Sequence, residues 1–378
     1  MRIAIVHYTA PPIVGGVERI VAEQAQALAR RGHEVTLMCG NTDAVVPGVR
    51  IVIPQELNPE GSAPLAALLA DHEAVFVHNL FTMPFNLTAT AVLRGLAVDR
   101  PEVHWVNWVH DVAAVNPSYM HLPWQQPDFT MLKQPPTGCT HVAVSAARQS
   151  EYLSLTHLPE GAVRVIPNGV DVARILNLTD RISTLADHLR LWDRDHVIVH
   201  PARVVRRKNI ELGLQVTATL KSLGLDVAYL ITGAPDPHQA DSKAYGDELI
   251  NLWKQLHLEH YAYFLGTTGT LSDEDVRGLY QVSDALLFPS KSEGFGLPIV
   301  EAALHGLPVF CSDIAAHREV GLGQVMYFDL DEAPAAIAQR IITHPQVGSR
   351  HRRRLTFGAR LDWRRICATH LEPLLKRQ

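Results

Sequence analysis

The sequence lacks several patterns that would assign the chain to a class at once. Its four cysteines stand far apart and form no C-x-x-C pair, which argues against a zinc site and against a disulfide framework. It contains no apolar run long enough to cross a bilayer, no internal repeat and no low-complexity segment. The formal net charge of -5 gives no reason to expect nucleic-acid binding. With 47% hydrophobic and 19% charged residues, the composition is that of an ordinary globular protein.

The start of the chain also lacks the layout of a signal peptide. Arg2 to His7 reads directly as a strand, Arg-Ile-Ala-Ile-Val-His. Together with the unpaired cysteines, this predicts a cytoplasmic protein, and peripheral contact with the inner face of the membrane is left open. The basic run His351 to Arg354 is typical of a solvated helix face, and we expect that role in preference to a membrane or phosphate patch.

Short apolar runs alternate with amphipathic segments along most of the chain, which is the pattern of parallel sheets covered by helices. With 378 residues the chain is long enough for two domains. The alternation pauses after Asn168-Gly-Val-Asp171 and resumes at His196. We therefore predict an α/β fold with two Rossmann-like, doubly wound domains, residues 1–170 and 196–345, joined by a linker over 171–195. Ligands of such domains bind outside the carboxyl ends of the strands, so the expected site is a cleft between the domains.

The strand predictions follow the apolar runs, and the helix predictions follow the amphipathic segments between them. Strands are expected near Ile3 to His7, Glu34 to Met38, Ile51 to Ile53, Ala74 to His78, Val103 to His110, Val142 to Ser145, Val163 to Pro167, Val197 to His200, Val227 to Thr232, Tyr261 to Leu265, Ala285 to Phe288, Val309 to Cys311 and Val325 to Phe328. Helices are expected over Val17 to Arg31 and Pro84 to Leu96, and from Asn209, Asp247, Ser272, Leu297 and Asp331.

The most informative stretch surrounds an acidic pair, Glu293-Gly-Phe-Gly-Leu-Pro-Ile-Val-Glu301. It follows a predicted buried strand, and Pro298 stands in the first turn of the helix expected from Leu297. A helix N-terminus can hold a phosphate or sugar hydroxyls, and the glycines let a ligand approach the backbone. Two carboxylates beside such a turn indicate a ligand with two hydroxyl-bearing ends, such as a sugar joined through diphosphate to a nucleoside.

A basic loop follows the strand that ends at His200, and it precedes a predicted helix. Cations at a helix start oppose the helix dipole, so a negative ligand should offset them, and a diphosphate is the natural candidate. Arg203 would bind it as a planar fork and Lys208 as a point charge. Arg206 and Arg207 fit an exposed basic turn better.

Three further loops follow predicted strands. Gly15-Gly16 stands where a helix begins, without the G-x-G-x-x-G of dinucleotide sites, and either holds a diphosphate or forms only a tight turn. His110-Asp111 ends a strand beside a long insertion, which favours a functional histidine over a structural one. Leu265-Gly266 either presents backbone groups to a nucleobase edge or is an ordinary turn. Asp193-Arg-Asp195 precedes its strand, so we predict a surface turn there and no metal site.

Together these loops resemble the retaining glycosyltransferases with the two-Rossmann-domain GT-B fold, specifically family 4, also called glycosyl transferases group 1. The resemblance covers nearly the whole chain and is densest from Phe264 to Glu319. Its most specific element is the acidic pair with seven intervening residues, Glu293 and Glu301. One departure is Pro201-Ala202-Arg203, where the family has Gly before Arg, and this concerns the local backbone path.

The resemblance implies a role for each loop. Glu301 should bind the donor ribose, and Glu293 should bind the donor sugar together with the backbone that follows it. His110 matches the histidine near the transferred sugar. The implied catalytic residues are His110, Glu293, Arg203 and Lys208, and the implied donor-binding residues are Gly15, Gly16, Arg203, Lys208, Leu265, Gly266, Glu293, Gly294, Phe295, Gly296, Leu297 and Glu301.

The implied reaction moves a hexosyl unit, with retention, from a nucleotide-diphosphate sugar to a hydroxyl of a sugar, a glycolipid or a small molecule. The donor would be a UDP-sugar or GDP-mannose, and no metal or other cofactor would be required. The first domain would bind the acceptor and the second the donor, with residues 346–378 forming a helix that returns to the first domain. The alternatives are an epimerase or phosphorylase of the same fold, or a non-catalytic subunit that binds nucleotide sugars.

Aromatic residues gather in two loops of the first half. The insertion from Val112 to Gly138 carries Tyr119, Trp124 and Phe129, and an earlier loop carries Phe81 and Phe85. Aromatic faces suit the sugar rings or lipids of an acceptor, but a small satellite core beneath a loop fits equally well. The sequence does not choose between these interpretations.

Overall fold

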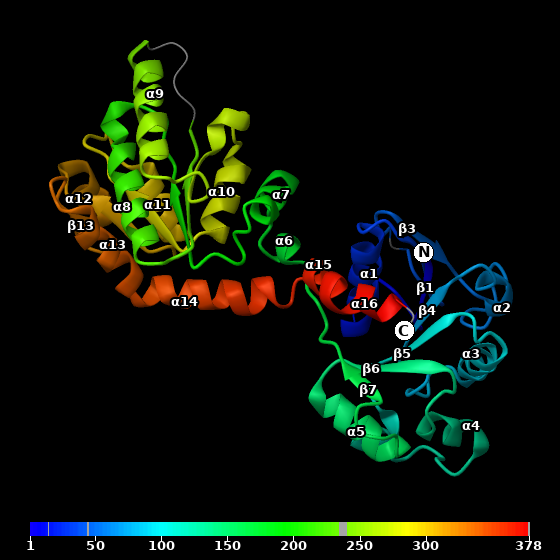
Figure 1. Cartoon of the computed structure of the whole chain (residues 1–378). Helices are drawn as coiled ribbons and strands as arrows, with labels where there is room; N and C mark the ends of the chain where they lie inside the picture. The colour runs from blue at the N-terminus through cyan, green and yellow to red at the C-terminus, as the bar shows by residue number, and fades with distance from the viewer. Residues whose placement is uncertain (14, 44, 234–239, 377–378) are drawn as a thin grey trace. The chain divides into compact units, whose positions relative to one another are not determined.

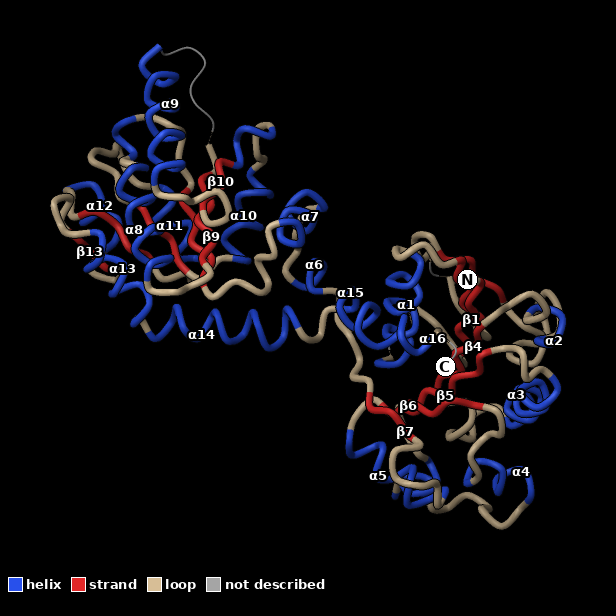
Figure 2. The backbone as a smooth tube through the Cα atoms, viewed as in Figure 1, coloured by secondary structure: helices blue, strands red, loops and turns tan. Residues whose placement is uncertain are grey.

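The chain folds into two compact units, each built on one parallel sheet (Figures 1 and 2). The computed structural model describes residues 1–13, 15–43, 45–233 and 240–376. One unit comprises Met1–Asp171 with Leu361–Gln378, and the other comprises Val172–Arg360. Each unit is described by itself below.

The sheet of the first unit has seven parallel strands in the order β3-β2-β1-β4-β5-β6-β7. Its strands are β1 (Arg2–Val6), β2 (Glu34–Met38), β3 (Val49–Val52), β4 (Ala74–His78), β5 (His104–Val109), β6 (Cys139–Ala143) and β7 (Val163–Val165). Ile3 of β1 lies opposite Val35 of β2 on one side and Ala74 of β4 on the other. All five residues of β4 are buried, as expected for an apolar strand covered on both faces.

Helices cover both faces of this sheet because successive strand residues point to opposite sides. Ile3 and Ile5 pack with α1 and with the C-terminal helices, whereas Ala4 and Val6 pack with α2 and α3. The helices are α1 (Gly16–Ala29), α2 (Leu65–Leu68), α3 (Leu87–Asp99), α4 (Pro127–Thr130), α5 (Ala146–Thr156), α15 (Trp363–Ile366) and α16 (Glu372–Leu375). Trp363 ties the returning segment to α1, since its indole N–H donates to Glu23 Oε2 at 3.1 Å.

The sheet of the second unit has six parallel strands in the order β10-β9-β8-β11-β12-β13. They are β8 (His196–His200), β9 (Val227–Ile231), β10 (Ala262–Phe264), β11 (Ala285–Phe288), β12 (Val309–Ser312) and β13 (Met326–Phe328). The helices are α6 (Val172–Ile175), α7 (Asp180–His188), α8 (Ile210–Ser222), α9 (Ala240–Gln255), α10 (Asp273–Val282), α11 (Leu297–Leu304), α12 (Ala315–Gly321), α13 (Pro334–Thr343) and α14 (Pro345–Arg353). The two doubly wound sheets confirm the predicted α/β class.

Residues 172–195, which the sequence assigns to a linker, are folded as part of the second unit. Thr179 caps α7 and donates to Asp275 Oδ1 at 2.5 Å, and Arg181 donates to the carbonyl of Thr270 at 2.6 Å. Asp275 also forms a capping box with Ser272 at the start of α10. The polar composition of 172–195 therefore reflects capping and ion pairing rather than a free connection.

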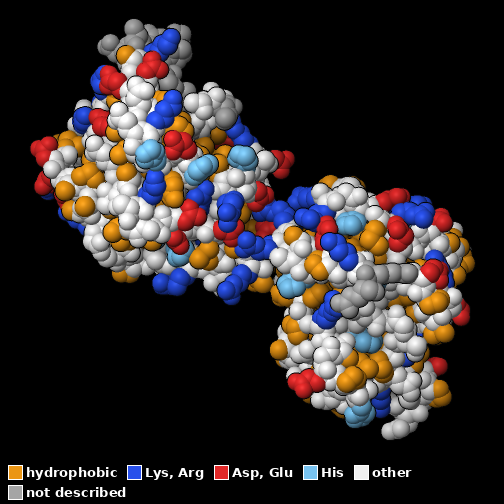
Figure 3. Space-filling model, viewed as in Figure 1, with side chains coloured by type: hydrophobic (Ala, Val, Ile, Leu, Met, Phe, Trp, Pro, Cys, Tyr) orange, Lys and Arg blue, Asp and Glu red, His pale blue; other side chains and the backbone are white. Residues whose placement is uncertain are grey.

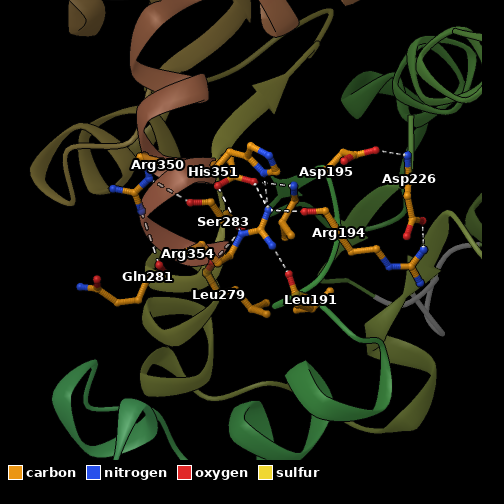
Figure 4. A network of polar contacts seen from close by, with 12 residues as sticks. Leu191, Arg194, Asp195, Asp226, Leu279, Gln281, Ser283, Arg350, His351 and Arg354 are labelled. Carbon is orange, nitrogen blue, oxygen red and sulfur yellow. Dashed lines mark hydrogen bonds and ion pairs between the residues drawn. The ribbon is translucent and has the colours of Figure 1, made fainter. Parts of the chain in front are cut away.

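The basic run at the end of α14 differs from the predicted solvated face. Figure 3 shows Lys and Arg side chains gathered over α14, and Arg352 and Arg353 are exposed there. Arg354 instead turns inward, as Figure 4 shows, and is only 8% exposed. Its guanidinium lies 2.8 Å from Asp284 Oδ2 and also donates to the carbonyls of Leu191 and Arg194. The prediction is thus wrong for Arg354, which forms a buried ion pair.

Both strand orders reverse at one point, and this point sets where ligands can bind. In the first unit the reversal lies between β1 and β4, and in the second between β8 and β11. Loops that leave the carboxyl ends of two such strands diverge and leave a crevice between them. Within the described residues, no helix combines the length and apolar character that a bilayer span requires.

Candidate functional site

A cluster of charged side chains occupies the switch point of the second unit. Lys208 comes from the loop after β8 and Glu293 from the loop after β11, so 85 residues separate them in sequence. The Lys208 ammonium donates to Glu293 Oε1, and the two side chains are only 10% and 8% exposed. Lys208 Nζ also lies 4.8 Å from the centre of the Phe288 ring. The loops after β8 and β11 therefore bring a cation and a carboxylate together at this edge of the sheet.

Arg207 completes the cluster, although the sequence assigned it to an exposed basic turn. Its Nη1 donates to Glu293 Oε2 at 2.9 Å and to the carbonyl of Ser292 at 3.1 Å. Burial raises the pKa of Glu293, but the hydrogen bonds from Lys208, Ser290 and Arg207 outweigh it and leave the pKa below its ordinary value. Glu293 is thus an ionised carboxylate with a cation on each oxygen. Arg206, by contrast, pairs with Glu248 at the surface as expected.

The turn after Glu293 has the geometry that the sequence predicts. Gly296 has φ of +100° directly before α11, in a region that side chains other than glycine rarely adopt. Gly294 has no heavy atom within 4 Å of where its Cβ would stand, so the backbone there is open to an approaching ligand. The N-terminus of α11 has no side-chain cap, which leaves the Leu297 N–H available, because Pro298 has no N–H and the Ile299 N–H donates to the carbonyl of Gly296 at 2.9 Å.

Glu301 has a different hydrogen-bond partner from Glu293. It is exposed on α11 and accepts a hydrogen bond at 2.8 Å from the Tyr280 hydroxyl of α10. Tyr280 carries no signal in the sequence, because only the packing of α10 against α11 brings its hydroxyl to this carboxylate. The two acids of the motif therefore have different partners, which suits two different parts of one ligand.

The remaining predicted residues of this unit lie in loops at the same edge of the sheet. Arg203 is exposed at the start of the loop that carries Lys208. The departure at Pro201-Ala202 is accommodated, since the Ala202 N–H donates to Thr232 Oγ1 at 3.2 Å at the end of β9. Leu265 and Gly266 form a short turn after β10, with Leu265 buried. Because β9 and β8 separate β10 from β11, this turn is the farthest of these loops from Glu293.

A pocket of about 890 Å³ occupies the switch point of the first unit. Its lining includes Gly16 and Glu18 after β1, Phe85 after β4, and His110 and Asp111 after β5. Gly15 does not appear in that lining, and a side chain there would collide with Glu18, since a Cβ would lie 1.9 Å from Glu18 Oε2. Of the predicted glycine pair, Gly16 faces the pocket.

The aromatic residues of this unit divide between the two interpretations. Phe81 and Trp124 are buried in core clusters, and Phe129 packs partly against the cluster of Trp124. Phe85 and Tyr119 line the pocket, and their ring centres lie 6.1 Å apart. The main core thus accounts for Phe81 and a satellite core for Trp124 and Phe129, whereas Tyr119 contacts both the satellite core and the pocket, and Phe85 lines the pocket.

His110 is held by a second histidine that the sequence did not single out. Its Nε2 lies 2.9 Å from Nδ1 of His78, the last residue of β4, and its Nδ1 lies 3.5 Å from Asn168 Nδ2. Burial lowers the pKa of His110 to about 3 and that of His78 well below the usual value, so both rings are neutral near pH 7. One ring therefore donates and the other accepts, which fixes the plane of His110.

Replacing His78 with phenylalanine is expected to lower turnover while leaving the fold intact. The variant removes the hydrogen bond to His110 Nε2, so the His110 imidazole is no longer held in one orientation. We expect kcat to fall roughly 10- to 100-fold as a result. His78→Asn is the matched control, because an amide near the Nδ1 position can keep the bond. Steady-state kinetics and thermal unfolding of both variants test this. Equal kcat values for the two variants would count against a positioning role.

The chain is similar to known glycosyltransferases over most of its length. The model of "Glycosyltransferase Family 4" matches residues 14–174, and that of "Glycosyl transferases group 1" matches residues 184–341. An uncharacterized glycosyltransferase, MJ1607 of Methanocaldococcus jannaschii, is 25% identical over 85% of this chain and 82% of its own length. The serotype-specific mannosyltransferase WbdA of Escherichia coli is 45% identical over 42% of this chain, a match that spans 24% of WbdA. The crystal structure of Anabaena Alr3699/HepE in complex with UDP-glucose aligns over 99% of both chains, with 20% identity and a TM-score of 0.39.

The two family models divide the chain almost as its two units do. Two Rossmann-like units with these family matches define a glycosyltransferase of the GT-B type. The chain belongs to glycosyltransferase family 4, the glycosyl transferases of group 1.

Proposed function

We propose that this glycosyltransferase moves a hexosyl unit from a nucleotide-diphosphate sugar to an acceptor hydroxyl, with retention of configuration and without a metal. The observation that carries the proposal is the buried Lys208–Glu293 pair, with the exposed Arg207 on its second oxygen, beside the open turn at Gly294. A site that mixes cations, an ionised carboxylate and a free backbone N–H group can bind phosphates and sugar hydroxyls together.

The departing diphosphate develops negative charge, and the second unit supplies groups to stabilise it. Lys208 and the exposed Arg203 would contact the phosphates, and the uncapped start of α11 would add its dipole and the Leu297 N–H. Glu301 would accept from the ribose, and Leu265 and Gly266 would meet the nucleobase. Because these groups provide the charge stabilisation, no metal ion is needed, and turnover should be unchanged by chelating agents.

The retained configuration follows from attack on the face that the diphosphate leaves. The bond between the anomeric carbon and the phosphate oxygen breaks, and the acceptor oxygen forms the new bond to that carbon. The departing phosphate takes the acceptor proton. Glu293 positions the sugar.

A screen of nucleotide sugars tests the proposal directly. We expect one of the UDP-, GDP- or ADP-sugars to raise the midpoint of thermal unfolding and to be hydrolysed slowly, because binding to the folded state stabilises it. GDP-mannose comes first in the screen because of the match to a mannosyltransferase. Glu301→Gln should weaken this stabilisation, whereas Glu319→Gln should not. A chain that no nucleotide sugar stabilises, and that hydrolyses none, would contradict the proposal.

A further inference from the structure

The pocket of the first unit contains an exposed aromatic ring that its neighbours hold in place. Phe85 is 60% exposed, and its ring centre lies 5.3 Å from that of Tyr8 and 6.1 Å from that of Tyr119, both in edge contacts. Tyr8 is anchored in turn, because its hydroxyl donates to the carbonyl of Met83 at 2.9 Å. A ring fixed by two edges leaves a face for a ligand to cover. The apolar C–H face of a sugar ring suits such a surface.

A carboxylate faces the same pocket without a protein partner. Asp111 is half-buried, and within the described part of the chain its carboxylate makes no hydrogen bond or ion pair. Its position is nevertheless fixed, since Asn79 Oδ1 accepts from the backbone N–H groups of His110 and Asp111 at 2.8 and 3.1 Å. A half-buried carboxylate gains from hydrogen-bond donors, and the hydroxyls of a polyol supply them.

The charges of the pocket disfavour an anionic ligand. Among the described lining residues there is no lysine or arginine, and two carboxylates, Glu18 and Asp111, are present. The imidazoles of His7 and His110 add no positive charge near pH 7, because burial lowers the pKa of both. A phosphate on a ligand of this pocket would therefore meet like charges and no cation.

We propose that the acceptor bound in this pocket is an uncharged polyol, a sugar unit without phosphate. Its ring stacks on Phe85, and its hydroxyls donate to Asp111. The acceptor role rests on the proposed function, whereas the preference for an uncharged sugar rests on the lining of the pocket alone. Asp111 and Phe85 are then specificity-determining residues of the transferase.

Binding of matched sugars to the full chain tests the preference without any turnover. Saturation-transfer NMR would compare mannose with mannose 6-phosphate, and glucose with glucose 6-phosphate, in the absence of nucleotide. We expect one uncharged member to bind about tenfold more tightly than its phosphate. Phe85→Ala should weaken binding of the uncharged sugar about tenfold. Asp111→Asn should also weaken binding of the uncharged sugar, and it should reduce the difference in affinity between that sugar and its phosphate.

The chain offers a control for each variant. Phe357→Ala removes a phenylalanine of similar exposure, 58%, from the second unit, and Asp128→Asn removes an exposed carboxylate outside the pocket lining. Both controls should bind the sugars as the unaltered chain does. Tighter binding of a phosphate, no binding of either class, or equal effects of the pocket and control variants would overturn the proposal.

This test fails separately from that of the proposed function. If the chain binds uncharged sugars but turns over no nucleotide sugar, the proposal for the pocket stands and the proposed transferase reaction is contradicted. If the chain glycosylates only sugar phosphates, the proposed transferase reaction stands and the proposal of an uncharged acceptor is contradicted.

Discussion

Lys208→Ala is expected to lower kcat/KM for the nucleotide sugar by about 10²- to 10³-fold, the usual cost of removing one group that stabilises developing charge. The ammonium is buried and held in place by Glu293 before any ligand arrives, so it needs no reorganisation when the diphosphate departs. Glu293→Gln should also lower turnover strongly, because it removes the charge that orients Lys208 and Arg207. The double variant should be little worse than either single variant, since the residues act as a unit.

Lys291→Ala provides the matched control for Lys208. This lysine also pairs with a glutamate, Glu211, at 2.8 Å, but its side chain is 50% exposed. Its removal should change kcat/KM little, because an exposed ion pair contributes weakly and its ammonium is outside the cluster. Steady-state kinetics with the donor identified by the screen would measure all four variants. Full activity of Lys208→Ala would contradict the role of Lys208 in stabilising the departing diphosphate. Full activity of Glu293→Gln would contradict the role of Glu293 in orienting Lys208 and Arg207.

Arg354→Met should produce the largest loss of stability, about 3–5 kcal/mol in the free energy of unfolding of the second unit. The replacement leaves the Asp284 carboxylate, whose side chain is 1% exposed, without its charged partner. It also leaves the carbonyls of Leu191 and Arg194 without the guanidinium that contacts them (Figure 4). The backbone N–H of Val197, which donates to Asp284 at 2.8 Å, cannot replace that charge.

Arg353→Met is the control for this prediction, because it changes the neighbouring residue, which is exposed. Its effect should lie within about 0.5 kcal/mol of zero. Denaturant unfolding followed by circular dichroism would compare the two variants with the unaltered chain. Equal stability of the two variants would show that Arg354 contributes no more than a surface arginine.

The strands were predictable from the sequence because each is a short apolar run bounded by turn residues. Ala74–His78 and Ala285–Phe288 even keep their predicted bounds. The capping box at Ser272 is also a local feature, since its two partners, Ser272 and Asp275, lie within one turn. These features depend on residues that are neighbours in the chain, and local patterns carry that information.

The contacts that the sequence did not reveal join residues far apart in the chain. The local sequence does not distinguish Arg207 from Arg206. Arg207 meets Glu293 only because β11 lies beside β8 in the sheet. His78 reads as the end of a buried strand until β5 places His110 beside it. Arg354 belongs to a run of basic residues, and its inward direction depends on Asp284, 70 residues earlier. Local composition suggests the residue types of a site but not their pairing.

The return of the chain at Leu361 makes the second unit a single continuous insertion within the first. The two crossing points are adjacent, since the Val170 N–H donates to the carbonyl of Leu361 at 2.7 Å and the Trp363 N–H donates to that of Val170 at 3.2 Å. Residues 172–360 could therefore be excised as one piece, and a very short linker would close the first unit. The pocket lined by Phe85 and Asp111 lies wholly within that remainder, so the excision would leave all of its lining residues in one shorter chain.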